Sequence, residues 1–427
     1  MAEVGAKVSL NAIGKQDTYL TRDDPTYSFF NYEPKQHANF TKFHRSTNVR
    51  TPRDKDNWPF GETVKVTMYP KFMGDLLSNM YLYMKFPGVT GGIRLADQLG
   101  RHLIKSIKMR VDEQVLEIFH DDWGIIYDEL YLDASEKRTK RYTINRNLAE
   151  DTSLVEPNAS LLSQSDSELM IPIPLFFSRK YEGDEYATNK PNRPYFPLCA
   201  IHNQKLEFEI EFHPQPFFTD YTAGLLKLDS FDIITEEMTV SKEERTFLKT
   251  QRQIFVTDIV KKHPSVTSEV GSDTLRMELV PDIPVKTINW FLRDENATFD
   301  NHFNFSANTT YSVTNSFFEP IMDSAKIYIK GEDLPNIPLT KHPFYKYVIP
   351  FNSRLSRPNR NIYTYTFSMN PINVEPSGSL DFGQLQSNKT VLEVKLVPGL
   401  TKPYELNMYY VGYQTFVFDG GFMTLAY

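Results

Sequence analysis

The segment Leu206–Phe212, LEFEIEF, alternates strictly between apolar and acidic side chains. Successive side chains of an extended chain point to opposite faces, so one face of this segment is wholly apolar and the other wholly acidic. A helix, with its period of 3.6 residues, would mix the two kinds around its circumference. The segment is therefore predicted to be a β-strand that covers a core with one face.

Similar alternation recurs along the chain, and the strands that it predicts follow the same layout in both halves. The first half has predicted strands at 64–68 and 80–86, a hairpin at 107–118 and the strand 206–212. The second half has a strand at 288–292, a hairpin at 325–333 and a late strand at 391–397. Aromatic residues make up 14% of the chain, and its 27 prolines outnumber its 19 glycines, which favours many strands joined by stiff loops. We predict an all-β fold.

The segment 361–383 joins an aromatic strand to a turn. Residues 362–369 alternate and are rich in Tyr, Thr and Phe, as in a half-buried strand. Pro376, Ser377 and Gly378 then predict a turn, because proline presets φ and glycine adopts a left-handed conformation at little cost. A second extended run follows the turn. We assign these three residues a structural role in folding and no role in binding or catalysis.

The length of 427 residues fits two domains of about 200 residues each. We predict an N-terminal arm at 1–25, a first jelly roll at 26–215, a linker with a short helix at 216–250 and a second jelly roll at 251–427. Ser241 and Glu244 have the spacing of a capping box, which indicates the helix of the linker. A further helix within 120–138 is predicted to cap an open end of the first sandwich. The predicted fold class is two tandem eight-stranded antiparallel jelly rolls with short helices in the loops.

Composition excludes several kinds of protein. The single cysteine, Cys199, rules out intrachain disulfides and a cysteine-based zinc cage. No window has the run of about 20 apolar residues that spans a bilayer, and the N-terminus lacks the apolar core of a signal peptide. The net charge of −7 argues against direct nucleic-acid binding, which normally needs a basic surface.

The search for catalytic and metal-binding patterns leads to no assignment: we predict no catalytic, cofactor-binding or metal-binding residues. The nearest candidate is His120-Asp121-Asp122, but adjacent residues rarely converge on one ion, and helix capping is favoured. For the basic run Lys137–Arg141 with Arg146, a solvated loop is favoured over a contact with phosphate, a membrane surface or an acidic neighbour. For Trp290, Tyr363 and Tyr365, packing in a core or an interface is favoured over a sugar platform.

Asn-x-Ser/Thr sequons occur at six positions, and three of them, Asn296, Asn304 and Asn308, crowd one segment that the clustering predicts to be an exposed loop. These three are the candidates for glycosylation. The lack of a signal peptide argues against modification. The other three are Asn39, Asn158 and Asn388.

The chain resembles the major capsid proteins of nucleocytoplasmic large DNA viruses, the iridovirus and phycodnavirus-like family, along nearly its whole length and in order. The matching segments, besides the strand and turn at 361–383, are Asp17–Thr21, Pro25–Phe30, His37–Phe40, Phe60-Gly61, Leu103–Ile107, Trp123–Leu130, Ile171–Phe177, Tyr195–Leu198, Ile283–Lys286 with Trp290, and Phe418–Met423. Asp112 and Glu113 depart from the family pattern, since many relatives have two glycines there. Adjacent non-glycine residues rarely adopt positive φ, so a different hairpin turn is expected.

The resemblance implies a double jelly roll with no enzymatic activity, no cofactor and a structural role. Three copies would form a pseudo-hexagonal capsomer that tiles the icosahedral shell of a double-stranded DNA virus. The implied partners are further copies of the chain, minor capsid and penton proteins and proteins of an internal membrane, with no direct nucleic-acid contact. The implied location is the virion shell, with assembly in the host cytoplasm.

Two alternatives remain open from the sequence. One is an assembly scaffold or minor capsid paralogue of the same fold. The other is a carbohydrate-binding or carbohydrate-active β-sandwich, which would need paired carboxylates about 5 to 10 Å apart in one cleft. Glu207, Glu209 and Glu211 are spaced along one strand face instead, which suits a surface.

Overall fold

The computed structural model describes residues 37–49, 58–87, 95–145, 167–180, 195–220, 224–307, 319–335, 340–373, 375–385 and 390–426, together with 2–10, several further positions before residue 31, and positions 222 and 337. These residues form two compact units, Met1–Asn39 and Phe40–Tyr427. The first unit contains helix α1 (Ala2–Leu10), in a stretch where the sequence had indicated an arm without clear periodicity. Within the described ranges, none of the helices has the length and apolar character needed to cross a membrane.

The first jelly roll is made of eight strands in two antiparallel four-stranded sheets, with the orders β1-β8-β3-β6 and β2-β7-β4-β5. The inward side chains of the two sheets fill the core between them, as the burial pattern BiBiBiB of β7 illustrates. The strands are β1 (Phe40–Asn48), β2 (Thr63–Met68), β3 (Leu76–Phe86), β4 (Ile104–Val111), β5 (Gln114–His120), β6 (Ser167–Pro172), β7 (Leu206–Phe212) and β8 (Ser230–Val240).

The second jelly roll repeats this plan strand by strand. One sheet has the order β10-β15-β12-β13, and the other has β9, β16, β11 and β14 side by side, with β17 added beside β16. The strands are β9 (Gln253–Thr267), β10 (Thr274–Glu278), β11 (Val285–Asp294), β12 (Met322–Ile329), β13 (Glu332–Leu334), β14 (Ile362–Thr366), β15 (Thr390–Leu396), β16 (Tyr404–Asp419) and β17 (Phe422–Leu425). The predicted double jelly roll is therefore confirmed, with one strand more than predicted in the second half.

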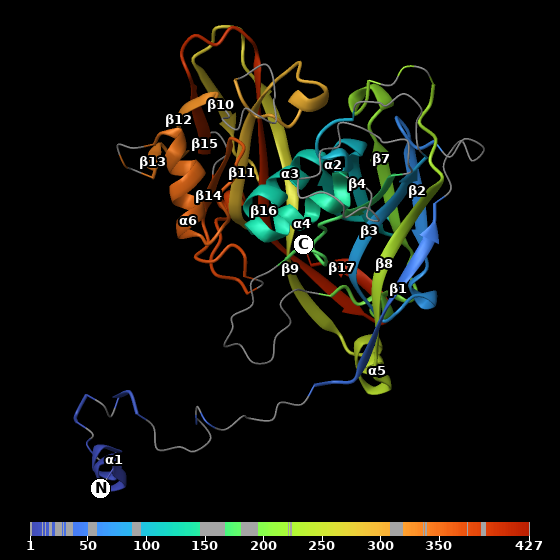
Figure 1. Cartoon of the computed structure of the whole chain (residues 1–427), viewed down its shortest axis with the longest axis vertical. Coiled ribbons are helices and arrows are strands. Elements are labelled where there is room, and N and C mark those ends of the chain that lie inside the picture. Colours follow the sequence, from blue (N-terminus) through green and yellow to red (C-terminus); the bar gives the residue numbers. More distant parts are fainter. Residues whose placement is uncertain are drawn as a thin grey trace. The chain divides into compact units, whose positions relative to one another are not determined.

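Helices occupy the loops of both jelly rolls, and Figure 1 shows α3 and α4 in the region between the two sets of strands. Every residue of α3 is buried, and its Trp123 ring lies 6.0 Å from the ring of Tyr409 in β16. The prediction that this helix caps an open end of the first sandwich is thus wrong, because it packs between the two jelly rolls. The helices of these loops are α2 (Leu99–Leu103), α3 (Asp121–Leu130), α4 (Ala134–Asn145), α5 (Lys242–Thr250) and α6 (Ile349–Asn352), with short turns η3 (Pro70–Phe72), η4 (Leu198–Ile201), η5 (Gln215–Phe217), η6 (Phe299–Asn301), η7 (Phe344–Val348) and η8 (Phe382–Gln384).

The range 216–250 holds more than the linker predicted there. Strand β8 pairs with β1 on one side and β3 on the other, so it is a central strand of the first jelly roll. The short helix is present as α5, and the Oγ of Ser241 accepts a hydrogen bond from the Glu244 amide, as the capping spacing predicted. The prediction of a linker is therefore wrong. The capping spacing indicated helix α5, but the sequence pattern of strand β8 before it was not recognised.

The two hairpins that mark matching places in the halves turn with positive φ. Asp112 has φ 50°, and its carboxylate accepts a hydrogen bond of 2.9 Å from the Lys205 amide. Aspartate tolerates this conformation better than most residues, because its short side chain bonds locally. Lys330 and Gly331, at φ 54° and 90°, turn the second hairpin. Asp112 thus adopts the positive φ of this turn, at a place where many relatives have two glycines.

The turn at Pro376, Ser377 and Gly378 closes the loop that follows β14. Ser377 Oγ donates to the Asn370 carbonyl and accepts from the Asn370 amide, both at 3.0 Å. Gly378 has φ 129°, as expected for a glycine turn. The run after the turn makes a single bridge, between Leu380 and Val285, and not the second strand that was predicted.

Candidate functional site

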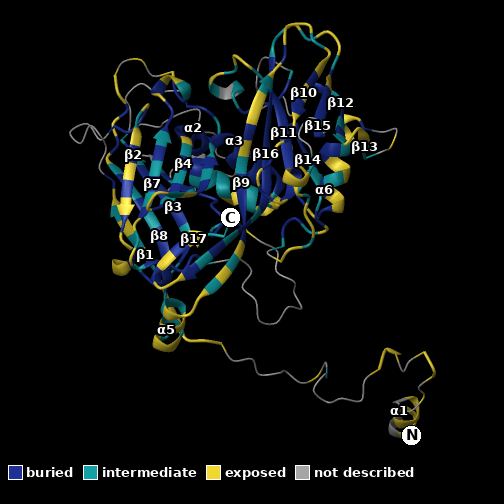
Figure 2. Ribbon diagram, turned by 180° about the vertical axis from the view of Figure 1, so that it is seen from behind, coloured by how far each residue is buried: buried dark blue, intermediate teal, exposed yellow. Residues whose placement is uncertain are grey.

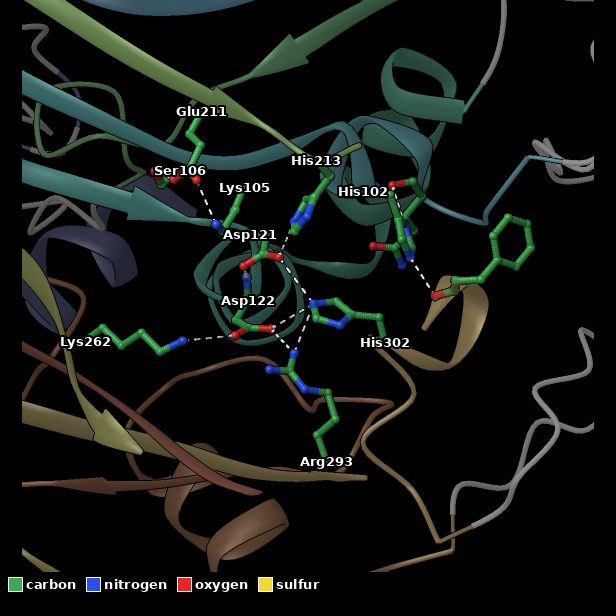
Figure 3. A network of polar contacts seen from close by, with 12 residues as sticks. His102, Lys105, Ser106, Asp121, Asp122, Glu211, His213, Lys262, Arg293 and His302 are labelled. Atoms are coloured by element: carbon green, nitrogen blue, oxygen red, sulfur yellow. Dashed lines mark hydrogen bonds and ion pairs between the residues drawn. The ribbon is translucent and has the colours of Figure 1, made fainter. Parts of the chain in front are cut away.

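The most extensive buried polar cluster described here lies where the two jelly rolls meet, and Figure 3 shows its side chains. Helix α3 begins directly after β5, with His120 in an extended conformation and Asp121 and Asp122 in the first turn. Carboxylates are favoured there because the first amides of a helix lack partners within the helix. The Asp122 amide donates to Asp121 Oδ1 at 2.7 Å. The predicted capping role of this pair is therefore wrong: His120 holds the cap position and makes no side-chain capping bond, while Asp121 and Asp122 lie within the first turn.

Asp122 also binds the second jelly roll. Arg293 of β11 donates from Nη1 to Asp122 Oδ1 at 2.8 Å and from Nη2 to Glu405 of β16 at 3.1 Å. Lys262 of β9 lies 3.7 Å from Asp122 Oδ2. One buried carboxylate of the first jelly roll is thereby matched by two cations of the second.

Asp121 gathers two histidines that are distant in sequence. Its Oδ2 lies 2.9 Å from His213 Nε2 and 3.2 Å from His302 Nε2. Burial alone would raise the pKa of the carboxyl, but the hydrogen bonds from His213 and His302 outweigh it and hold the pKa of Asp121 well below its usual range. Asp121 is therefore ionised under all ordinary conditions.

Ligand atoms of Asp121, Asp122 and His302 lie within 4.8 Å of one another, a spacing that could suit a metal ion. However, the Arg293 guanidinium is 2.8 Å from Asp122 and 3.0 Å from His302 Nε2, so it already brings positive charge into this space. We interpret the cluster as a structural ion-pair network. His120, the histidine adjacent in sequence, is outside the group of possible ligands.

Two further buried acids of the first jelly roll bind donors of the second. Glu117 accepts from the Val260 amide of β9 at 2.9 Å and from Arg179 at 2.5 Å. Glu129 of α3 accepts from Arg360 at 2.9 Å and from the Asn359 amide at 2.8 Å. Such bonds are directional and costly to break in a buried setting, so the whole set fixes the angle between the jelly rolls.

The C-terminal hairpin adds a second contact across the molecule. The Met423 amide of β17 donates to Gln204 Oε1 at 2.6 Å, and the Asn203 amide donates to the Gly421 carbonyl at 3.3 Å. The rings of Phe416 and Phe176 lie 5.2 Å apart. The second jelly roll therefore contacts the first at two separate places.

The basic run Lys137–Arg141 lies within helix α4, so the prediction of a solvated loop is wrong. Lys140 is buried against Asp128, with which it forms an ion pair, and burial lowers the pKa of Lys140 to about 8. Lys137 donates to the Glu129 carbonyl at 2.6 Å. A cavity of about 300 Å³ is lined by both lysines, by Arg138 and Arg141, and by the acids Asp128 and Glu129. Arg146 lies outside the described residues.

The aromatic and acidic residues considered as a sugar-binding or catalytic site lie in the core or in surface ion pairs. Trp290 and Tyr363 are fully buried in the core, as predicted, and the Trp290 ring is 5.1 Å from that of Tyr345. Glu209 and Glu211 of β7 form ion pairs on the outer sheet face, such as Lys105 with Glu211 at 2.7 Å.

The three clustered sequons are not equivalent. Asn296 is exposed, whereas Asn304 is 4% exposed, which leaves no room for a glycan in this fold. Asn308 lies outside the described residues, as do Asn158 and Asn388. The expectation of one exposed loop is therefore wrong at Asn304. Glycosylation of Asn296 remains a prediction.

His213, His302 and Arg293 were not identified from the sequence. They lie 92, 181 and 171 positions from their aspartate partners, and no local pattern marks a residue for such a contact. The charges of this cluster satisfy one another, and the arrangement holds two domains together. Two jelly rolls of one strand order, joined rigidly through such a contact, define a double jelly-roll protein.

Comparison with known proteins agrees with this class. The family model described as large eukaryotic DNA virus major capsid protein matches residues 243–405, and the model for the major capsid protein N-terminus matches residues 28–248. The major capsid protein of Pyramimonas orientalis virus is 22% identical, with 99% of each chain covered. That of Paramecium bursaria Chlorella virus 1 is 21% identical over 92% of this chain and 87% of its own. The chain belongs to the family of major capsid proteins of large eukaryotic DNA viruses.

Solved structures show the same fold. A quasi-atomic model of the PBCV-1 virus capsid has a TM-score of 0.75 and 17% identity, covering 94% of this chain and 100% of its own. The Faustovirus major capsid protein has a TM-score of 0.67 and 11% identity, covering 97% of this chain and 98% of its own. The fold is thus retained where most side chains differ.

Proposed function

We propose that three copies of this chain form a capsomer, and that such capsomers tile the icosahedral shell of a double-stranded DNA virus. The observation that carries this proposal is the repeated strand order of the two jelly rolls. Six similar domains from three copies can take nearly equivalent places around one axis, and the resulting tile can pack against neighbours on six sides. Membership of the major capsid protein family supports the same role.

The buried contact between the jelly rolls suits this role. A capsomer needs a fixed angle between its two domains, since every copy must present the same edges to its neighbours. Ion pairs such as that of Asp122 with Arg293 are directional and buried. Each contact between capsomers can then be weak, because many such contacts act together.

The partners in this proposal are other copies, minor capsid and penton proteins and proteins of an internal membrane. The location is the virion shell, after assembly in the host cytoplasm. No catalytic step is part of the proposed role. The alternative of an assembly scaffold or minor paralogue differs in its abundance: the proposal predicts that this chain dominates the protein content of purified virions, and a trace amount there would favour the alternative.

Light scattering on the purified chain during size-exclusion chromatography tests the trimer. The proposal predicts a particle of three times the chain mass of 49.6 kDa. A monomer at micromolar concentration, with no trimer released from virions, would overturn it.

A further inference from the structure

The cavity of about 300 Å³ beside α4 concentrates positive charge. Its cations are Lys137, Arg138, Lys140 and Arg141, which span little more than one turn of the helix. The end of α3 and the segment before α2 form other parts of its wall, and Figure 1 shows these three helices next to one another. Like charges on neighbouring turns repel one another, so a negative charge among them is stabilising.

The two carboxylates in the wall are already bound by arginines that do not line the cavity. Arg101 donates two hydrogen bonds to Asp128, at 2.9 and 3.2 Å, and Arg360 donates one to Glu129 at 2.9 Å. All four side chains are buried. With the four cations of α4, six cations therefore surround two carboxylates. Arg138 is exposed and has no carboxylate partner among the described residues.

Gln98 contributes an unused polar group to the same wall. Its side chain is 6% exposed, and its Oε1 has no hydrogen-bond partner within the described part of the chain. A buried oxygen in this state costs stability unless a bound group donates to it. The cavity thus offers a hydrogen-bond acceptor in addition to its cations.

These features favour one chemical class of ligand. Lysine and arginine side chains bind phosphate oxygens strongly, and Gln98 Oε1 calls for a hydroxyl or amine donor on the same molecule. Among the described residues of the lining, none is aromatic and Ala134 alone is apolar. The cavity therefore lacks a stacking surface for a nucleobase and an apolar surface for an alkyl chain. Its volume of about 300 Å³ suits a small organic molecule.

We propose that this cavity binds a phosphorylated polyol, with phosphate on the cations of α4 and a hydroxyl group donating to Gln98 Oε1. The inference goes beyond the proposed function, because the cavity is formed within one chain. The same chemical group occurs on free sugar phosphates and on the headgroups of phosphoinositide lipids.

The bound molecule would also strengthen the contact between the jelly rolls. Lys137 of the first jelly roll donates to the Arg357 carbonyl of the second at 3.2 Å, and Asn359 of the same loop lines the cavity. A ligand that binds only the folded chain stabilises it in proportion to its occupancy. The melting temperature should therefore rise with the concentration of the ligand.

Isothermal titration calorimetry with fructose 1,6-bisphosphate tests the site on the full purified chain. We expect one site per chain and about tenfold weaker binding by Arg138→Gln, the effect of one hydrogen bond to a charged group. Arg252→Gln is the matched control and should bind as the wild type does. Arg252 is exposed and directly follows α5, which Figures 1 and 2 show far from α2 and α3.

Two results of this titration would overturn the proposal. One is the absence of binding at millimolar fructose 1,6-bisphosphate. The other is equal weakening by Arg138→Gln and Arg252→Gln, because binding would then follow the net charge of the chain and not this cavity.

Comparison of ligands tests the role of Gln98. Fructose 1,6-bisphosphate should bind more tightly than pyrophosphate, which has no polyol hydroxyl groups, and Gln98→Met should remove most of this difference. A difference that persists in Gln98→Met would overturn the assigned acceptor. ATP supplies a test on the wild-type chain alone: tighter binding of ATP than of fructose 1,6-bisphosphate would overturn the assignment to a polyol.

Vesicles of phosphatidylcholine that contain phosphatidylinositol 4,5-bisphosphate distinguish the two sources of the ligand. Sedimentation of the chain with these vesicles, reduced by Arg138→Gln, would support the proposal with a lipid headgroup as the ligand. Binding of fructose 1,6-bisphosphate without sedimentation would support it with a free sugar phosphate. Light scattering should give the same particle mass with and without ligand, so a failure of this inference is distinguishable from a failure of the proposed trimer.

Discussion

Arg293 in the second jelly roll and Asp122 in the first form a hydrogen-bonded ion pair of 2.8 Å in which both side chains are almost completely buried. The pair joins residues 171 positions apart. It lies at the centre of the contact that orients the two domains. A charge in this setting depends on its partner, because neither group can be solvated by water.

Removal of one partner should therefore destabilise the fold strongly. Arg293→Leu leaves Asp122 with the more distant Lys262 and His302 and a 3.4 Å hydrogen bond from the Tyr409 hydroxyl. We expect a loss of about 3–5 kcal/mol in the free energy of unfolding. Urea denaturation at fixed protein concentration measures it. Lys105→Leu is the control: Lys105 and Glu211 are 53% and 40% exposed, so its loss should stay below about 1 kcal/mol. Equal effects of the two substitutions would contradict the structural role of the buried pair.

His102 should make the fold sensitive to acid. Burial, and next the nearby His302, lower the pKa of His102 from 6.5 to about 3. The native state keeps this imidazole neutral, whereas the unfolded chain protonates it below pH 6.5. Stability from this group is therefore complete above pH 6.5 and is lost as the pH falls from there towards 3. At pH 5 the loss is about 2 kcal/mol relative to pH 7.5.

His102→Gln removes the titrating group and keeps a donor that can reach the Phe299 carbonyl, which lies 3.2 Å from His102 Nε2. Denaturation of the wild-type chain and of the variant at pH 7.5 and pH 5 separates the effect of His102 on the free energy of unfolding from the effect of the carboxylates. The difference between the two pH values should be smaller in the variant. The same difference in both proteins would show that His102 does not drive the acid sensitivity.

Gly378→Ala should destabilise the loop after β14. Gly378 has φ 129°, a conformation that side chains rarely adopt, and a Cβ there would lie 3.1 Å from the Phe367 carbonyl oxygen. We expect a cost of about 1–3 kcal/mol in thermal or chemical unfolding. The neighbouring Ser379 is exposed, so Ser379→Ala should change stability little. If Gly378→Ala left the stability unchanged, the structural role assigned to this turn would be wrong.

Glycosylation, if it occurs in the sequon cluster, should spare Asn304. Its side chain is 4% exposed and Asn296 is exposed, so a glycan can be attached in the folded state at Asn296 and not at Asn304. Peptide mass spectrometry of intact virions distinguishes the two sites. A glycan on Asn304 would mean that the segment folds differently from the structure described.

Strands and hairpins could be predicted from the sequence because their signals are local. The alternation of Leu206–Phe212 and the turn at Lys330 and Gly331 each lie within a few residues, and the structure has β7 and the β12-β13 hairpin there. Strand β8 was missed. Four consecutive buried residues, Thr235–Met238, interrupt its alternation, and two of them, Glu236 and Glu237, are of a type usually found at the surface.

The contact between the domains could not be predicted in the same way. The pattern around Trp123 indicated a helix, but which surface would cover it depended on Tyr409, nearly three hundred positions later. The charge of Asp121 and Asp122 suggested capping or metal binding, and the partners that distinguish these possibilities come from other strands and loops. Long-range pairing of this kind is decided by packing, for which one sequence carries no local signal.

The trimer is the central claim, and its mass is the most direct test. Light scattering of the purified wild-type chain should give three times 49.6 kDa. A wild-type mass of 49.6 kDa at micromolar concentration, with no trimer recovered from virions, would contradict the proposed capsomer.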